Sequence, residues 1–407
     1  MIACSGIDRA GKTTLACYLR DTCGRSLRHF TRPPLPTYRY LMLQLADTHP
    51  RMVLDRLGHF DELVYGPVYR SQMTLTSHQW RLIELTLLTL GCVVVNLTDS
   101  PEGIKSRWGD DEMWPSWGIE AIQEGFAALA QGTSWPKSHL PISTWTLPEL
   151  LRGGKPTEAL AEVVQLAQDR ERAAALLPPP SLFLGSADAE FLVIGEAPAP
   201  GGPLKDAQGS DPDLPFSRGP ASEWLWRAFD EVGLHWWRGA YCNAATFDSS
   251  ASLWWWFRAL RPHLSAVRQV VCLGERAAKF VHEQQRDGWR VSCTHVWHPS
   301  YVRQFRHREY PEWRDALTVA LADWCEGAHL ALERGGYPDG GGEIEPHRPG
   351  SGPAPAVAEP LAPDEKARTC VSCRGRGFEQ TEGASIGSDF VTCAACAGRG
   401  YSIRIAS

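Results

Sequence analysis

A short run near the N-terminus combines residue types that can hold a polyphosphate. Gly6, Gly11, Lys12 and Thr13 occupy every fixed position of the pattern G-x-x-x-x-G-K-[ST], and Thr14 follows them. Glycines let backbone amides approach phosphate oxygens, a lysine places a positive charge on the β- and γ-phosphates, and a threonine hydroxyl is a ligand for Mg²⁺. We therefore expect this loop to bind the phosphates of ATP together with Mg²⁺.

The segments on either side of the loop suit that role. Met1–Ser5 can form a short buried strand, and Leu15–Arg20 has apolar residues at helical spacing. A loop between a strand and a helix directs the free amides of the helix N-terminus towards one point, where an anion satisfies them. The alternative is a chance match in a glycine-containing turn, but the flanking segments favour the phosphate loop.

Further residues in and after the loop resemble a known family. The loop contains Asp8 and Arg9, residues 52–56 read MVLDR, and residues 60–70 read FDELVYGPVYR. Together these segments resemble thymidylate kinases, phage-type members in particular. The resemblance implies that Asp8 holds the sugar of the acceptor nucleotide and that Arg9 serves the transferring phosphoryl group.

The same resemblance implies residues for the acceptor nucleotide. Arg56 and Arg70 are candidates for its phosphate, Asp55 for binding the same substrate, and Phe60 and Tyr65 for stacking near its base. The alternative for the Asp55–Arg56 pair is a surface ion pair that contributes little to stability.

The rest of the N-terminal part predicts a doubly wound α/β domain over residues 1–177. Apolar strands alternate with helical segments, the arrangement of a parallel sheet covered on both faces. After the strand predicted at 92–97, a helix start and the residues up to 112 resemble the lid of nucleoside monophosphate kinases, which closes over ATP. Arg107 is the candidate lid arginine. The resemblance also allows a homodimer through this domain.

Composition sets limits on the whole chain. Its 407 residues predict two or three domains, and 43% hydrophobic with 22% charged residues is typical of a globular protein. A net charge of −6 argues against an overall basic nucleic-acid coat. The sequence shows neither a membrane-spanning apolar run nor a signal peptide, so we expect a cytoplasmic protein. Eight of the twelve cysteines are scattered among apolar residues and are expected to be buried thiols: Cys4, Cys17, Cys23, Cys92, Cys242, Cys272, Cys293 and Cys325.

A second α/β pattern begins after Pro178–Pro180. Residues 191–194 read as a buried strand that leads into the sequence GEAP, and 270–274 as another strand followed by a helix. Between these segments and after them come a Pro-Phe pair, the sequence YCN and the sequence HPSY. In this order they resemble uracil-DNA glycosylases of the bacterial and archaeal group, which predicts a three-layer α/β domain over residues 182–330.

Cleavage of an N-glycosidic bond needs polar groups near the sugar and a hydrogen-bond donor to the departing base, which must be flipped out and stacked. Glu196 is the candidate for orienting water, Phe216 for stacking, Asn243 for reading a pyrimidine edge, and His298 for donating to the base. Tyr301, Val302 and Arg303 form a candidate wedge into DNA, with Arg303, Arg306 and Arg308 on phosphates.

Several features depart from that family. Ala199 stands where its first motif has glycine, residues 201–213 look like an insertion, and the paired cysteines that help to hold an iron–sulfur cluster are absent before Phe191. No cluster is predicted. For His298 the alternative is an ordinary core or turn histidine, and for Trp254–Trp256 we favour packing over base stacking.

The C-terminal part carries four clustered cysteines. After a Gly- and Pro-rich linker at 331–366, the pattern C-x-x-C-x-G-x-G occurs twice, with Cys370 and Cys373, then Cys393 and Cys396. Four thiolates in two such pairs suit tetrahedral Zn²⁺, which predicts a structural zinc module at 367–405. The repeats resemble the zinc-binding repeats of the DnaJ chaperone family. Metal-free thiols are the alternative.

Two functions remain open on the sequence. One is a bifunctional enzyme that phosphorylates a deoxypyrimidine monophosphate, either dTMP or a modified dUMP, and removes uracil or a related base from DNA. The other is a deoxynucleotide kinase joined to a non-catalytic module that binds DNA or a protein partner. The residues do not distinguish the acceptors, and they leave open whether the zinc module contacts protein or nucleic acid.

Overall fold

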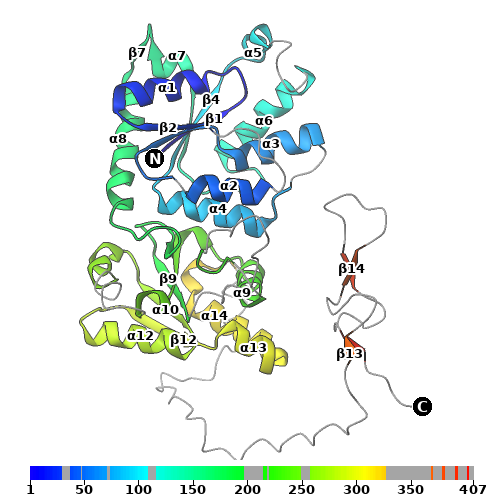
Figure 1. Ribbon diagram of the computed structural model, residues 1–407, viewed down its shortest axis with the longest axis vertical. Coiled ribbons are helices and arrows are strands. Elements are labelled where there is room, and N and C mark those ends of the chain that lie inside the picture. Colours follow the sequence, from blue (N-terminus) through cyan, green and yellow to red (C-terminus); the bar gives the residue numbers. More distant parts are fainter. Residues whose placement is uncertain are drawn as a thin grey trace, which may run out of the picture. The chain divides into compact units, whose positions relative to one another are not determined.

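The structure is a computed structural model (Figure 1). It describes residues 1–29, 37–46, 48–70, 74–108, 116–196, 214–217, 220–248 and 257–326, and four short strands near the C-terminus. The contacts divide the chain into two compact units, residues 1–337 and 338–407. The first unit contains two five-stranded sheets. The finer domain limits expected from the sequence stay a prediction.

The first sheet is entirely parallel and has the order β2-β3-β1-β4-β5. Its strands are β1 Ile2–Gly6, β2 Ser26–His29, β3 Met52–Asp55, β4 Val93–Thr98 and β5 Ile142–Thr146. The connections after β1 and β4 leave towards opposite edges of the sheet, which creates a crevice at the carboxyl ends of these two strands. The phosphate loop follows β1 into that crevice.

Helices cover both faces of this sheet, with α1 and α8 on one side and α3 and α6 on the other (Figure 1). Sequence signals start several of them: Thr76 and Gln79 form a capping box at α4, Ser100 caps α5 and Thr157 caps α8. The helices are α1 Lys12–Cys23, α2 Thr37–Ala46, α3 Gly58–Arg70, α4 Ser77–Thr89, α5 Pro101–Arg107, α6 Ile119–Gln131, α7 Leu147–Leu150 and α8 Glu158–Ala174. A short hairpin pairs β6 Leu151–Arg152 with β7 Lys155–Pro156.

The second sheet has the order β12-β11-β9-β10-β8, in which only the edge strand β8 is antiparallel. Its strands are β8 Phe183–Leu184, β9 Phe191–Gly195, β10 Gly239–Asn243, β11 Gln269–Leu273 and β12 Ser292–Val296. The connections after β9 and β11 leave towards opposite edges, so a second crevice opens at the carboxyl ends of these neighbours. The described helices around it are α9 Pro220–Glu231, α10 Ala244–Asp248, α12 Glu275–Arg286, α13 Pro299–Phe305 and α14 Tyr310–Ala320.

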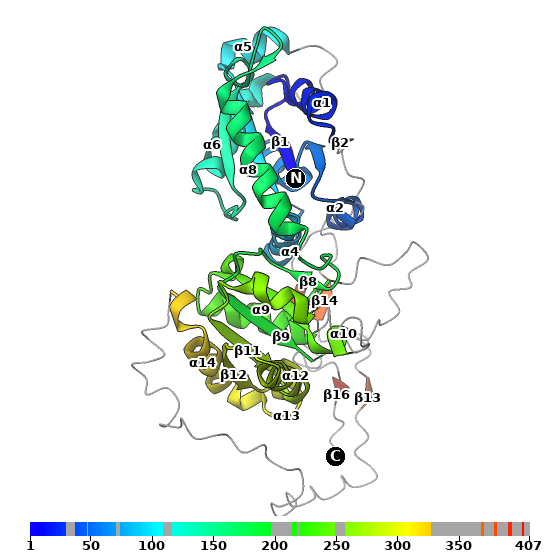
Figure 2. The same ribbon diagram turned by 90° about the vertical axis from the view of Figure 1, so that its left-hand side faces the viewer.

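The apolar core joins the two sheets. One buried cluster runs from the first sheet, through Trp80 of α4, to Trp226 and Trp324 on one side of the second sheet. A separate cluster containing Phe247 and Phe280 covers the other side. Helix α4 lies against β8 (Figure 2). The two sheets therefore share one apolar core. The local sequence patterns predicted each sheet separately and did not reveal this contact.

The eight scattered cysteines are free thiols, and Cys17, Cys23 and Cys293 among them are only partly buried. Among the described residues, no helix is both long enough and apolar enough to cross a membrane. In the second unit, β13 Arg368–Thr369 pairs with β16 Tyr401–Ser402, and β14 Phe378–Gln380 pairs with β15 Phe390–Thr392. The four clustered cysteines lie outside the described residues.

The close approach of β1 to β4 gives a stability prediction. A Cβ atom added at Gly6, where φ is +117°, would lie 2.1 Å from the carbonyl oxygen of Leu97, whereas one added at Gly24, where φ is +60°, meets nothing within 4 Å. We expect Gly24→Ala to cost about 1–2 kcal/mol, the price of a left-handed alanine. Gly6→Ala should cost more than about 4 kcal/mol, because backbone must move. Urea unfolding of both full-length variants checks this, and equal midpoints would contradict it.

Candidate functional site

The backbone of the phosphate loop has positive φ angles at three residues, a conformation that glycine adopts readily and other residues adopt only with strain. Gly6 and Gly11 have φ values of +117° and +99°, and Arg9 has a φ of 65°, in the left-handed region that is unfavourable for a residue with a side chain. A Cβ atom at Gly11 would lie 2.8 Å from Cδ2 of Leu147. The loop is thus enclosed at both ends, by β4 at Gly6 and by α7 at Gly11.

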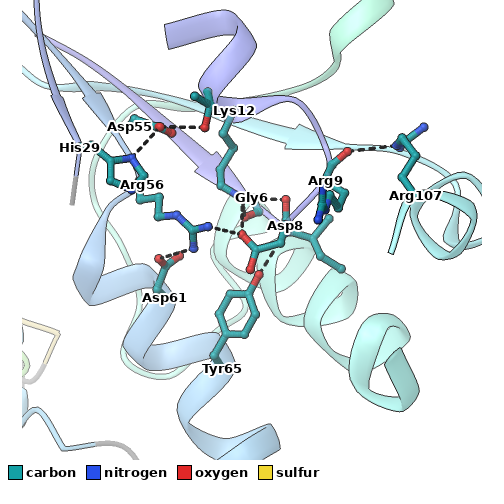
Figure 3. Close-up of polar contacts among 12 residues, drawn as sticks. Gly6, Asp8, Arg9, Lys12, His29, Asp55, Arg56, Asp61, Tyr65 and Arg107 are labelled. Atoms are coloured by element: carbon teal, nitrogen blue, oxygen red, sulfur yellow. Dashed lines mark hydrogen bonds and ion pairs between the residues drawn. The ribbon is translucent and has the colours of Figure 1, made fainter. Parts of the chain in front are cut away.

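Lys12 lies inside the loop (Figure 3). Its ammonium group donates to the carbonyl oxygens of Gly6 at 2.8 Å and Ile7 at 2.7 Å, and to Oδ1 of Asp8 at 3.1 Å. An ammonium has three hydrogens, so these contacts use its donor capacity. A phosphate oxygen that enters the loop must replace one of the three acceptors. The lysine is already placed for that exchange.

Asp8 links the loop to the next strand. Its Oδ1 accepts from Lys12 and also from Nη2 of Arg56, at 2.6 Å. Its backbone amide donates to the hydroxyl of Tyr65 at 3.0 Å. Burial acts to raise the pKa of Asp8, but Lys12 and Arg56 outweigh it, so the pKa lies below its ordinary value of 3.8. The Asp8 carboxylate is therefore charged throughout the physiological range.

Arg56 is held by acids on two sides. Besides Asp8, it lies 3.7 Å from Oδ2 of Asp61, a residue in the first turn of α3 (Figure 3). Its backbone has a φ of 87°. Although 22% of the Asp61 side chain is exposed, its Oδ1 is buried and accepts no hydrogen bond from the described residues. Burial raises the pKa of Asp61 to about 6, even though Arg56 and Lys12 act to lower it.

A separate group of oxygens gathers beside the loop. The hydroxyl of Thr13 donates to Oδ2 of Asp55 at 2.8 Å, and Nδ1 of His29 lies 2.7 Å from the same oxygen. Asp55 is buried, and its Oδ1 accepts no hydrogen bond from the described residues. A hydroxyl and a carboxylate with a free oxygen are the ligand types that Mg²⁺ prefers.

Arg107 contacts the loop from α5. Its Nε donates to the carbonyl oxygen of Arg9 at 3.2 Å, and its Nη2 to Oδ2 of Asp99 at 2.5 Å. These contacts place the candidate lid arginine beside the phosphate loop (Figure 3). The acidic residues 110–112 lie outside the described residues.

Other expected residues lie elsewhere. Phe60 is only 1% exposed, and its ring stacks on Trp80 with the centroids 5.9 Å apart, so it has no free face for a base. Tyr65 is also buried and positions Asp8 through its hydroxyl. Arg70 ends α3, but its side chain lies outside the described residues; Thr14 is exposed in the first turn of α1. Asp61 and His29 were not expected from the sequence, and only Asp61 has a signal there, its place soon after Arg56.

The second crevice gathers three of the expected side chains at the carboxyl ends of its strands. Glu196 follows β9, Asn243 ends β10, and His298 comes soon after β12. A Cβ atom at Gly195 would lie 2.5 Å from Oδ1 of Asn243 and 2.9 Å from Cζ of Phe216. Glycine at 195 is what allows the amide and the ring to approach the end of β9.

Glu196 lies against the start of α12. Its Oε1 accepts from the amide of Arg276 at 3.3 Å, and a Cβ atom at Gly274, which has a φ of +96°, would lie 2.3 Å from that oxygen. The glutamate thus bridges the ends of β9 and β11. Its carboxylate is also close enough to His298 to affect the titration of that ring.

His298 caps α13 with its own ring. Nδ1 accepts from the amide of Ser300 at 3.2 Å, so a neutral ring carries its proton on Nε2. Burial lowers the pKa of His298 below 6.5, although Glu196 acts to raise it. The histidine is therefore a neutral donor through Nε2 at pH 7. His298 is thus a turn histidine, as the alternative interpretation expected, and it can still donate a hydrogen bond to a ligand.

The candidate wedge needs a correction. Val302 is fully buried and so cannot enter a base stack, whereas Tyr301 is 41% exposed and Arg303 is partly buried. Tyr301 stands in a row with Trp297 and Phe305, with ring centroids 5.8 and 5.5 Å apart. Neither partner was expected from the sequence. The spacing of four residues signals Phe305, which shares one face of α13 with Tyr301, whereas Trp297 precedes that helix and has no such signal.

Some predicted features cannot be placed. Ala199, residues 201–213, Trp254–Trp256 and the four clustered cysteines lie outside the described residues. In the part of the chain that the structure describes, no group of three or more His, Cys, Asp or Glu side chains is arranged to hold a metal ion. The zinc module stays a prediction.

Comparisons with known proteins give low similarity. No family model matches the sequence, and no curated protein matches it. YorR protein from Bacillus subtilis, solved in complex with phosphorylated GDP, is 21% identical over 41% of this chain and 97% of its own, with a TM-score of 0.33. Deoxyadenosine kinase from M. mycoides with bound dCTP is 14% identical over 41% of this chain and 98% of its own, with a TM-score of 0.27. TM-scores this low do not establish the fold or function of this chain.

Asp61 gives a prediction about pH. Its pKa of about 6 in the folded chain exceeds the ordinary 3.8, so the folded chain holds this proton more tightly than the unfolded chain. Between about pH 4 and 6 the unfolded chain releases the proton first, and stability falls as the pH rises. Asp61→Asn removes this loss. Relative to wild type, we expect its urea midpoint to be similar near pH 4 and higher at pH 7.

The control is Asp188→Asn, because Asp188 is exposed. Its midpoint should follow that of the wild type across the same range. If the difference in urea midpoint between Asp61→Asn and wild type stays constant with pH, burial does not raise the pKa of Asp61 and the prediction is wrong.

Proposed function

We propose that the loop site transfers the γ-phosphoryl group of ATP to the phosphate of a deoxypyrimidine monophosphate. The observation that carries this is the shared oxygen Oδ1 of Asp8, which contacts Lys12 on the donor side and Arg56 on the side of β3. A single carboxylate thereby fixes the spacing between a phosphate-binding cation and a second cation. Two phosphates that must react need that arrangement.

Each residue has a role in this reaction. Lys12 binds the β- and γ-phosphates once it leaves a loop carbonyl, and the loop amides accompany it. Arg56 binds the phosphate of the acceptor, an oxygen of which attacks the γ-phosphorus while the bond to ADP breaks. Arg107, next to the carbonyl of Arg9, stands where it can meet charge on the transferring group. Tyr65 and Asp61 hold Asp8 and Arg56 in place.

The residues beside the loop fit a Mg²⁺ ion. The Thr13 hydroxyl and the free Oδ1 of Asp55 would hold it, directly or through water. When bound, this ion neutralises charge on the phosphate oxygens. We therefore assign Asp55 to the donor side, away from the acceptor role expected by resemblance. His29 fixes the orientation of the Asp55 carboxylate through Oδ2.

Replacing Lys12 tests the proposal. We expect Lys12→Met in the full-length chain to lower the rate of phosphoryl transfer by about 100-fold or more, since it removes a charge fixed on the transferring group. The assay measures ADP formed from ATP with each deoxynucleoside monophosphate in turn, including dTMP and 5-hydroxymethyl-dUMP. The matched control is Lys155→Met on the exposed hairpin, which should retain full activity.

A wild-type chain that binds ATP but phosphorylates no member of that panel would overturn the proposal. Transfer to deoxynucleosides alone would place the acceptor hydroxyl, rather than a phosphate, at Arg56 and would also contradict it.

The second crevice supports a second candidate function, removal of uracil or a related base from DNA. The observation that favours it is the neutral His298 ring, whose Nδ1 accepts from Ser300 and whose Nε2 proton is therefore available. As the N-glycosidic bond breaks, its electron pair moves to the base, and a donor at a base oxygen stabilises that charge. Water then adds to the sugar carbon and loses a proton, and Glu196 is the carboxylate in the crevice that can orient it.

Two other residues suit recognition of the flipped base. The Asn243 amide offers a donor and an acceptor next to Gly195, and the Phe216 ring lies against the same glycine. A base stacked on Phe216 would present its edge to Asn243. The rival remains a non-catalytic module that binds DNA or a protein through this crevice.

One assay separates these alternatives. Full-length protein is incubated with single- and double-stranded oligonucleotides that contain uracil or 5-hydroxymethyluracil, and abasic sites are measured. We expect base release, lowered about 100-fold or more by His298→Ala or Asn243→Ala, because each removes a hydrogen bond to the departing base. The control is His282→Ala, an exposed histidine on α12, which should act like wild type. DNA binding by the wild type without abasic product would establish the rival.

A further inference from the structure

The backbone at Phe216 adopts a conformation that its neighbours must maintain. Its φ of 55° is in the left-handed region, which is unfavourable for an aromatic residue. The carbonyl oxygen of Phe216 accepts from Nε1 of Trp226 at 2.9 Å, and the hydroxyl of Ser217 donates to the carbonyl of Leu214 at 2.8 Å. The position of the Phe216 ring against Gly195 thus depends on contacts outside the crevice.

Ser217 and Trp226 are in turn contacted by α4, which belongs to the half of the unit that carries the phosphate loop. Nε2 of His78 lies 3.3 Å from the carbonyl oxygen of Ser217. Because a carbonyl only accepts, this nitrogen carries the proton and donates it. The His78 ring also lies 5.9 Å from the Trp226 ring, between centroids. A single side chain therefore contacts both supports of Phe216.

Arg81, one turn further along α4, also contacts Trp226. Its guanidinium carbon is 4.7 Å from the centroid of the Trp226 ring and 5.5 Å from that of Trp236, and it pairs with Asp230 of α9. The Arg81 side chain is only 6% exposed, and its Nε and Nη1 are buried without hydrogen-bond partners among the described residues. A buried charge with unused donors is costly, and the contacts that offset this cost, with Asp230 and Trp226, are both on α9, so Arg81 sets the position of α9 against α4.

We propose that α4 is a working part of the second crevice, with His78 and Arg81 as positioning residues that hold the Phe216 backbone and so place the surface on which a flipped pyrimidine base stacks. The geometry of the second crevice then depends on α4, and therefore on the half of the unit that carries the phosphate loop. The part of this proposal that concerns base release rests on the second candidate function. The part that concerns the conformation of Phe216 rests only on the contacts described above.

The test uses a pair of variants at one position in the full-length chain. His78→Phe keeps a ring beside Trp226 but removes the donor to Ser217, whereas His78→Gln keeps an N–H donor. Each is prepared with 4-fluorophenylalanine at position 216 and examined by fluorine NMR. We expect a single shifted resonance for wild type and His78→Gln, and a broadened or displaced resonance for His78→Phe. Arg81→Met should displace it as well.

The same variants, without the fluorine label, are assayed for base release and phosphoryl transfer. Base release by His78→Phe should fall about 3- to 10-fold, the effect of one lost hydrogen bond, and His78→Gln should restore it. Phosphoryl transfer should be unchanged in both, which excludes general unfolding. If wild type releases no base, the second candidate function fails, but the resonance still decides the positioning role. An unchanged resonance in both His78→Phe and Arg81→Met would overturn the inference.

Discussion

The phosphate loop depends on the hydrogen bonds that the ammonium group of Lys12 donates. It satisfies two carbonyls of a loop whose backbone is left-handed at Gly6, Arg9 and Gly11, and it places Asp8 through the same set of contacts. Without a cation there, carbonyl dipoles and a carboxylate would point at one another inside a buried space. The loop is thus held in shape by the group that must later bind substrate, so little reorganisation is needed when phosphate arrives.

The charges around Lys12 do not balance. Asp8 contacts both Lys12 and Arg56, and Asp61 contacts Arg56. The third carboxylate, that of Asp55, contacts the Thr13 hydroxyl and His29 instead of either cation. Two buried oxygens of this group accept no hydrogen bond from the described residues, Oδ1 of Asp55 and Oδ1 of Asp61. Burial raises the pKa of Asp61, so this carboxyl holds a proton more tightly than it would in water. For Oδ1 of Asp55, a divalent cation is the partner that such a free carboxylate oxygen suits.

The features that the sequence predicted depend on residues close together in the chain, whereas those that it missed depend on contacts between distant segments. The loop, the helix caps and the buried strands follow from residues close together in the chain, so their types and spacing were sufficient. The resemblance put Glu196, Asn243 and His298 in one site, but only Glu196 follows a strand that the sequence predicted, and the strands β10 and β12 before the other two emerged with the structure. By contrast, the aromatic type of Phe60 could not distinguish a core side chain from a base-stacking one, and only the contact with Trp80 decides. The Asp55–His29 and His78–Ser217 contacts join distant segments, and nothing local signals them.

Helix α4 shows why the two halves of the first unit belong together. From Trp80 to Thr89 every residue of this helix is buried, a pattern expected for a helix surrounded by protein rather than one on a domain surface. Its polar side chains are paired in both directions: Glu84 contacts His59 at 3.2 Å within the first half, while Thr89 accepts from the amide of Gly185 at 2.8 Å in the second. Separating the halves would expose the apolar residues of α4 and leave Arg81 without Asp230 and the tryptophan faces. The free energy of folding is therefore shared between the halves, and the geometry of the second crevice is inherited in part from the fold around the phosphate loop.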